Sequence, residues 1–74
     1  MSNIHANINV WDKDGYLHQI FDVMFVRYFN PTKNERESSR DLVKSLYPNY
    51  KRATLVVMHY DKNNYNDKNN TIEL

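Results

Sequence analysis

The strict alternation of apolar and polar residues from Ile4 to Val10 constrains the fold more than any other feature of this sequence. Successive side chains of a β-strand point to opposite faces, so this pattern predicts a half-buried strand. The strand leads toward Asp14-Gly15, and Asp-Gly between two apolar runs is a strong hairpin signal because glycine tolerates a positive φ. The chain is therefore expected to begin with an antiparallel hairpin.

The register of this hairpin depends on the number of residues in its loop. A two-residue loop at Asp14-Gly15 sets Ala6 opposite Val23, so that two apolar faces meet. A three-residue loop sets Ala6 opposite the charged Asp22 instead. The sequence therefore favours an even loop.

The second predicted strand, residues 16–29, is apolar on both of its faces. In the even register, one face meets the apolar residues of the first strand and the other face has no partner within the hairpin. The unpartnered face predicts a protein interface formed by Ile20, Met24, Val26 and Tyr28.

A helix is expected after Pro31, which cannot donate to a strand ladder. Two overlapping capping boxes, Thr32 with Glu35 and Asn34 with Glu37, mark its start. Pro48 predicts that the helix ends near residue 47. Its apolar residues lie only in the second half, so only that half is expected to pack on a core.

The run from Ala53 to Tyr60 is rich in β-branched and aromatic residues and predicts a third strand. Residues 61–70 are polar and low in complexity, and residues 71–74 are interpreted as a frayed end in preference to a fourth strand. The expected fold is α+β, a two-layer ββαβ sandwich with a three-stranded, mainly antiparallel sheet and one helix. Residues 1–60 would form the single domain, and residues 61–74 a flexible Asn-rich tail.

Composition excludes several classes of chemistry. The 74 residues include no cysteine, which rules out disulfides, thiolate metal sites and cysteine nucleophiles. The single glycine belongs to the hairpin, so no glycine-rich phosphate loop is available. The sequence has no membrane span and no secretory signal, which predicts a cytoplasmic protein, in the host cytoplasm if a phage encodes it.

Three histidines are the candidate metal ligands or acid–base groups. His5 and His18 lie at opposite ends of the predicted hairpin, about 20 Å apart at the rise of a strand, and His59 could join only one of them. We therefore predict no metal site, no cofactor and no catalytic residue. A small ribonuclease is retained as the third hypothesis, because such enzymes act with a few basic, histidine and tyrosine side chains.

Residues 31–52 form a basic segment, with six basic and three acidic residues. Within the helix, Arg36, Arg40 and Lys44 are spaced to share one face, and Lys51 and Arg52 follow it. These five residues are the candidate nucleic-acid-binding set. The interleaved carboxylates are expected to neutralise part of it, Asp41 beside Arg40 among them, so nucleic-acid binding is the second hypothesis.

The leading expectation is a small non-enzymatic protein that binds another protein. Eleven asparagines, six lysines and six tyrosines indicate an AT-rich genome, such as that of a bacteriophage or mobile element. Together with the small size and the spare apolar face, this composition suggests an accessory protein that binds and inhibits or modulates a host protein. A homodimer is also expected, because a core of this size stabilises a chain by only about 3–5 kcal/mol.

Overall fold

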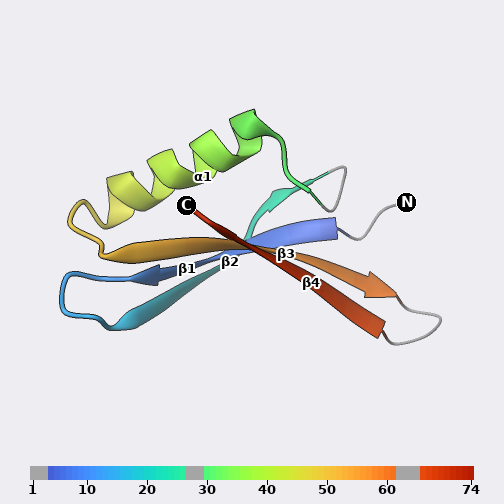
Figure 1. The fold of residues 1–74 in the computed structure, drawn as a ribbon, viewed down its shortest axis with the longest axis horizontal. Helices are drawn as coiled ribbons and strands as arrows, with labels where there is room; N and C mark the ends of the chain where they lie inside the picture. The colour runs from blue at the N-terminus through green and yellow to red at the C-terminus, as the bar shows by residue number, and fades with distance from the viewer. Residues whose placement is uncertain (1–3, 27–29, 62–65) are drawn as a thin grey trace.

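The computed structural model describes residues 4–26, 30–61 and 66–74, which form an antiparallel sheet with a helix on one face. Along the chain the elements are β1 (Ile4–Trp11), β2 (Leu17–Phe25), α1 (Lys33–Leu46), β3 (Arg52–Asp61) and β4 (Asn66–Glu73). The strand order in the sheet is β2-β1-β3-β4 (Figure 1). This is an α+β fold, as the sequence predicts, but with four strands.

The β1–β2 hairpin has a three-residue loop, so the predicted even loop is wrong. The amide of Asp12 donates to the carbonyl of Tyr16 at 3.0 Å, which leaves residues 13–15 as the loop. Gly15 is the last loop residue and has a φ of 88°. A three-residue loop that ends on a left-handed glycine is a common hairpin geometry, since it matches the twist of the two strands.

A bulge in β2 keeps the charged Asp22 away from the core, although the register set by the three-residue loop would bring it there. Ile8 lies opposite Ile20, and Ala6 lies opposite Met24, so the three residues 21–23 face Asn7 alone. Without these extra residues the register would place Asp22 opposite the buried Ala6. Burying a carboxylate without a partner costs far more than disturbing one ladder position, so the bulge keeps the charge out of the core.

Helix α1 begins and ends where the sequence predicts. The Thr32 hydroxyl accepts from the amide of Glu35 at 3.2 Å, and the Glu35 carboxylate accepts from the amide of Thr32 at 2.7 Å. Of the two capping boxes, the helix thus uses the first. Ser39 and Val43 are its buried residues, and the buried Ser39 hydroxyl donates to the carbonyl of Glu35 at 2.8 Å.

Strand β3 pairs antiparallel with β1, which is one of the two arrangements that the sequence allowed. Strand β4 then pairs antiparallel with β3 and forms one edge of the sheet. The expectation of three strands, with a frayed end at residues 71–74, is therefore wrong. Residues 62–65 of the predicted tail lie outside the described residues.

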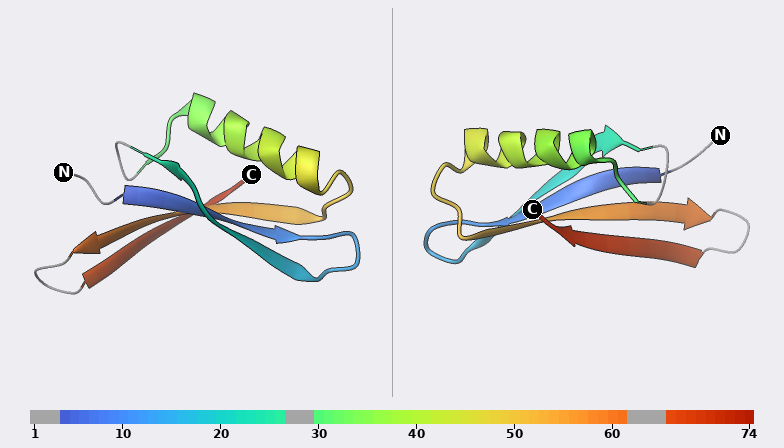
Figure 2. Two further views of the ribbon diagram at one scale, coloured as in Figure 1. Left: turned by 180° about the vertical axis from the view of Figure 1, so that it is seen from behind. Right: turned by 45° about the horizontal axis from the view of Figure 1, so that its top comes forward.

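The core lies between α1 and one face of the sheet (Figure 2). Its fully buried members alternate along the two central strands with residues of the opposite face, and Val43 covers them from the helix. They are Ala6, Ile8, Val10, Ala53, Leu55 and Val57. No helix of the described chain lies against the opposite face, which we call the open face (Figures 1 and 2).

Candidate functional site on the open face

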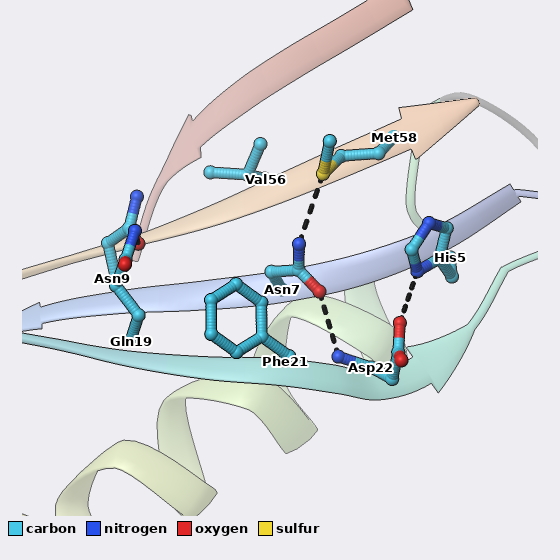
Figure 3. Close-up of a pocket in the computed structure, with 8 residues that line it drawn as sticks. All are labelled: His5, Asn7, Asn9, Gln19, Phe21, Asp22, Val56 and Met58. Atoms are coloured by element: carbon cyan, nitrogen blue, oxygen red, sulfur yellow. Dashed lines mark hydrogen bonds and ion pairs between the residues drawn. The ribbon is translucent and has the colours of Figure 1, made fainter. Parts of the chain in front are cut away.

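The candidate site is a shallow hollow of about 440 Å³ on the open face, around the β2 bulge (Figure 3). Three strands supply its lining. The lining residues are His5, Asn7 and Asn9 from β1, Gln19, Phe21 and Asp22 from β2, and Val56 and Met58 from β3. The hollow thus combines carboxamides with aromatic, aliphatic and thioether groups.

Asn7 connects the three strands across the floor of the hollow. Its amide nitrogen donates to the sulfur of Met58 at 3.0 Å, and its carbonyl oxygen accepts from the backbone amide of Asp22 at 2.8 Å. The second bond satisfies a backbone group that the bulge removes from the strand ladder. Asn7 therefore fixes the shape of the bulge from the neighbouring strand.

Asp22 is the one non-glycine residue with a positive φ in the described part of the chain, at 54°. Aspartate tolerates this left-handed conformation better than most residues. It still has a steric cost there, which glycine does not have. Its carboxylate bonds the Nδ1 atom of His5 (Figure 3). The side chain of Asp22 is 64% exposed, so this pair lies at the rim of the hollow.

Phe21 is the main apolar group presented to solvent at this site, with 65% of its surface exposed. It lies between the His5–Asp22 pair and the Asn9–Gln19 pair, in which the Gln19 amide donates to Asn9 at 3.2 Å (Figure 3). Exposing an aromatic ring to water is unfavourable by about 1.5–3 kcal/mol relative to burying it. Phe21 is therefore the residue that would gain most from a partner.

The charged side chains that the structure describes on the open face are paired with each other. Near the far end of β1, the Nε atom of Arg52 donates to the Glu73 carboxylate at 2.8 Å. The guanidinium of Arg52 also lies 4.7 Å from the ring centre of Trp11, in a cation–π contact. With the His5–Asp22 contact, each of the ionic side chains Asp22, Arg52 and Glu73 on the described open face has a partner.

The residues predicted as a protein interface lie on the other side of the sheet. Val26 is a core residue at 4% exposure, and Ile20 and Met24 pack against the core. The error follows from the loop, because the odd register turns the even-numbered residues of β2 toward the helix. Tyr28 lies outside the described residues. The sheet does have an uncovered face, but Ile20, Met24 and Val26 are not part of it.

The second histidine pair lies far along the hairpin, beside the helix end. His18 bonds the Asp12 carboxylate at 2.8 Å and stacks on Tyr47 with ring centres 4.8 Å apart. The hydrogen bond from His18, together with the backbone amides of Tyr16 and Asp14, lowers the pKa of Asp12 below its usual 3.8. These contacts give Asp12 a structural role in the hairpin.

Neither His–Asp pair is part of a larger group of possible metal ligands among the described residues. Among the described residues there is no group of three or more His, Asp or Glu side chains that could hold a metal ion. The side chain of His59 is outside the described set. The two pairs, at His5 and at His18, belong to opposite ends of the hairpin.

The candidate nucleic-acid-binding residues divide between the two faces. Arg52 belongs to the open face, where Glu73 pairs with it. Arg36 and Arg40 line a second hollow, of about 280 Å³, between α1 and the end of β4. Lys44 and Lys51 are exposed. The expected neutralisation of Arg40 by Asp41 is absent from the ion pairs of the described residues.

The chain matches no protein-family model, and no curated protein or solved structure is significantly similar to it. No described helix combines the length and the apolar character needed to cross a membrane.

Sequence reasoning missed the hollow, although one signal pointed to it. Asp22 interrupts the run Ile20-Phe21-Asp22-Val23-Met24, which is otherwise apolar. A charge within such a strand is best tolerated at a bulge, where the side chain can turn to solvent. The position of Asn7 opposite the bulge had no separate signal, because alternation alone assigns it to a solvent-facing position.

Proposed function

We propose that this protein is a non-enzymatic binding protein that docks on another protein through the open face. The observation that carries the proposal is the exposed Phe21, held beside a strained bulge in a hollow that Val56 and Met58 line. Backbone strain and bulges are found preferentially at functional sites. Protein interfaces are enriched in aromatic and methionine side chains, which supports this use of the hollow.

The charge of the open face favours a protein partner over a nucleic acid there. Phosphate contacts supply most of the affinity of nucleic-acid-binding proteins and need cations that are free to make them. On the described open face, Arg52 is engaged with Glu73 and His5 with Asp22. The carboxamides of Asn7, Asn9 and Gln19 instead suit the polar groups of a neutral protein surface.

The finer proposal is that the partner is a host protein and that the chain is a phage or mobile-element accessory protein acting in the host cytoplasm. Its support is the small size and the composition rich in Asn, Lys and Tyr, together with an open face that suits blocking a surface. We propose no catalytic residue, because each described His–Asp pair already has a structural role in the bulge or in the hairpin.

The test is affinity capture from a host extract, followed by direct binding of the purified partner. Phe21→Ala should raise the dissociation constant about tenfold to a hundredfold, because burial of the ring contributes about 1.5–3 kcal/mol to the binding free energy. Hydrogen exchange of the complex should show protection on β1 and β3 of the open face.

The matched control is Leu46→Ala, which removes an exposed apolar side chain from the helix, where Leu46 is 53% exposed. This variant should bind as the wild type does. Circular dichroism should show that both variants remain folded. Equal losses in the two variants, or protection confined to α1, would contradict docking through the open face.

A further inference from the structure

The flank of α1 that faces the end of β4 concentrates positive charge that the proposed protein interface does not use. Arg36, Arg40 and Lys44 are spaced at i, i+4 and i+8 and share this flank. The hollow of about 280 Å³ beside it is lined by Lys33, Arg36, Glu37, Arg40 and Glu73. At the helical rise, neighbouring members of the row are about 6 Å apart along the axis.

Two carboxylates that line the hollow beside this row are already engaged with other cations, and Asp41 forms no ion pair with the row. Glu37 pairs with Lys33 at 3.9 Å, and Glu73 pairs with Arg52 at 2.8 Å. None of Arg36, Arg40 and Lys44 forms an ion pair with a described carboxylate. The row therefore offers three cationic groups that a ligand can neutralise.

The lining of the hollow distinguishes between two classes of anionic partner. A protein interface needs an apolar centre, with charges mainly at its rim. All five lining residues of this hollow are charged, so it offers no apolar centre. A phosphodiester backbone needs none, because phosphate contacts from Arg and Lys supply its affinity without apolar burial.

We infer that the row formed by Arg36, Arg40 and Lys44 is a second binding surface, for the phosphate backbone of a nucleic acid. Two of the three cations are arginines, whose planar guanidinium can bind phosphate oxygens in a bidentate manner. Contacts of this kind position a nucleic acid without reading its sequence. The three cations lie on α1 and not on the open face, which this surface meets only at Glu73, and their binding does not depend on the proposed protein partner.

The experiment is fluorescence anisotropy with labelled 30-nucleotide single-stranded DNA, the matching duplex and the matching RNA, over a range of salt. Neutralising three phosphates releases about 0.7 counterion each from a single strand and 0.9 from duplex DNA. A fourfold rise in NaCl should therefore weaken binding about 20-fold to 40-fold. In Arg40→Gln/Lys44→Gln the same rise should weaken it only about threefold, because one cation of the row remains.

The control is Lys13→Gln, which removes one positive charge from the exposed hairpin loop. This variant should keep the wild-type salt dependence. Absence of binding at low salt, or a salt dependence that Lys13→Gln reduces as much as the helix variant does, would overturn the inference. Tighter binding to polyglutamate than to DNA at equal charge would also overturn it, in favour of an acidic protein ligand.

Discussion

At the scale of single residues, two aspartates of the first hairpin differ in their effect on the backbone: Asp12 stabilises it, and Asp22 has a strained conformation. Asp12 accepts hydrogen bonds from two backbone amides and from His18, so it stabilises the loop that it begins. Asp22 occupies a left-handed conformation, and Asn7 holds its amide in place. The Asp12 carboxylate thus stabilises its loop, whereas the backbone of Asp22 is held in a strained conformation.

The strain at Asp22 predicts an order of stability among its variants. Asp22→Ala keeps the left-handed backbone but removes the side chain that bonds His5, so it should be destabilised by about 1 kcal/mol. Asp22→Gly should be more stable than Asp22→Ala by about 1 kcal/mol, because glycine adopts a positive φ without steric cost. Urea denaturation monitored by circular dichroism measures both differences. Equal stability of the two variants would show that the left-handed conformation costs nothing.

The lowered pKa of Asp12 predicts a dependence of stability on pH. Because this pKa is lower in the folded protein than in the unfolded chain, the ionised carboxylate stabilises the fold above about pH 4. That stabilisation is lost as the pH falls through the folded pKa. Between about pH 6 and pH 2.5, the wild type should lose more stability than Asp12→Asn does.

The comparison uses urea midpoints of the two proteins at both pH values. Asp14→Asn removes a negative charge from the same loop without removing the Asp12 carboxylate, and it controls for the change in net charge. Identical pH dependence of the wild type and Asp12→Asn would contradict the stabilising role of the hairpin contacts.

At the scale of elements, the sequence predicted correctly those features that depend on interactions between residues close together in the chain. The Thr32–Glu35 capping box and the alternation in β1 predicted an element start and a strand correctly. The loop parity and the bulge could not be predicted, because they depend on which pairing of two strands avoids burying Asp22. Strand β4 was missed because an edge strand is held mainly by backbone bonds to β3, which polar residues form as well as apolar ones.

The pairing of β4 predicts that a substitution near the chain end destabilises the whole fold. Ile72 lies opposite Leu55 and packs against the core, so Ile72→Ala should cost about 1–3 kcal/mol of unfolding free energy. Thr71→Ala, at the exposed neighbouring position, should stay within about 0.5 kcal/mol of the wild type. Thermal and urea denaturation measure both variants. An unaffected Ile72→Ala would restore the interpretation of this segment as a tail.

At the scale of the whole molecule, one helix covers one face of a four-stranded sheet and leaves the other face open. The open face carries the carboxamides of Asn7, Asn9 and Gln19, and each carboxamide has both a donor and an acceptor group. Two copies related by a twofold axis could therefore pair their amides and cover Phe21. A partner protein would compete with this pairing for the same face.

We accordingly expect the isolated protein to form a dimer at concentrations near 100 μM. A dissociation constant of this size corresponds to a binding free energy of about 5.5 kcal/mol. Phe21→Ser should remain monomeric there, and Leu46→Ser, which alters the exposed helix, should dimerise as the wild type does. Sedimentation equilibrium measures all three. A wild type that is monomeric at this concentration, or a Phe21→Ser variant that dimerises equally well, would show that the open face does not pair with itself.

The position of β1 also has a consequence for synthesis on the ribosome. This strand is translated before the other three strands and lies inside the sheet, with β2 on one side and β3 on the other. The hairpin with β2 can close early, but β1 reaches its second neighbour only when residues as distant as His59, the partner of Ile4, have left the exit tunnel. Until then the nascent hairpin exposes the side chain of Ile8 and the backbone hydrogen-bonding groups on the β3 side of β1. We therefore expect the long β1–β3 pairing to close after the hairpin, and its closure protects both the side chain and the edge at once.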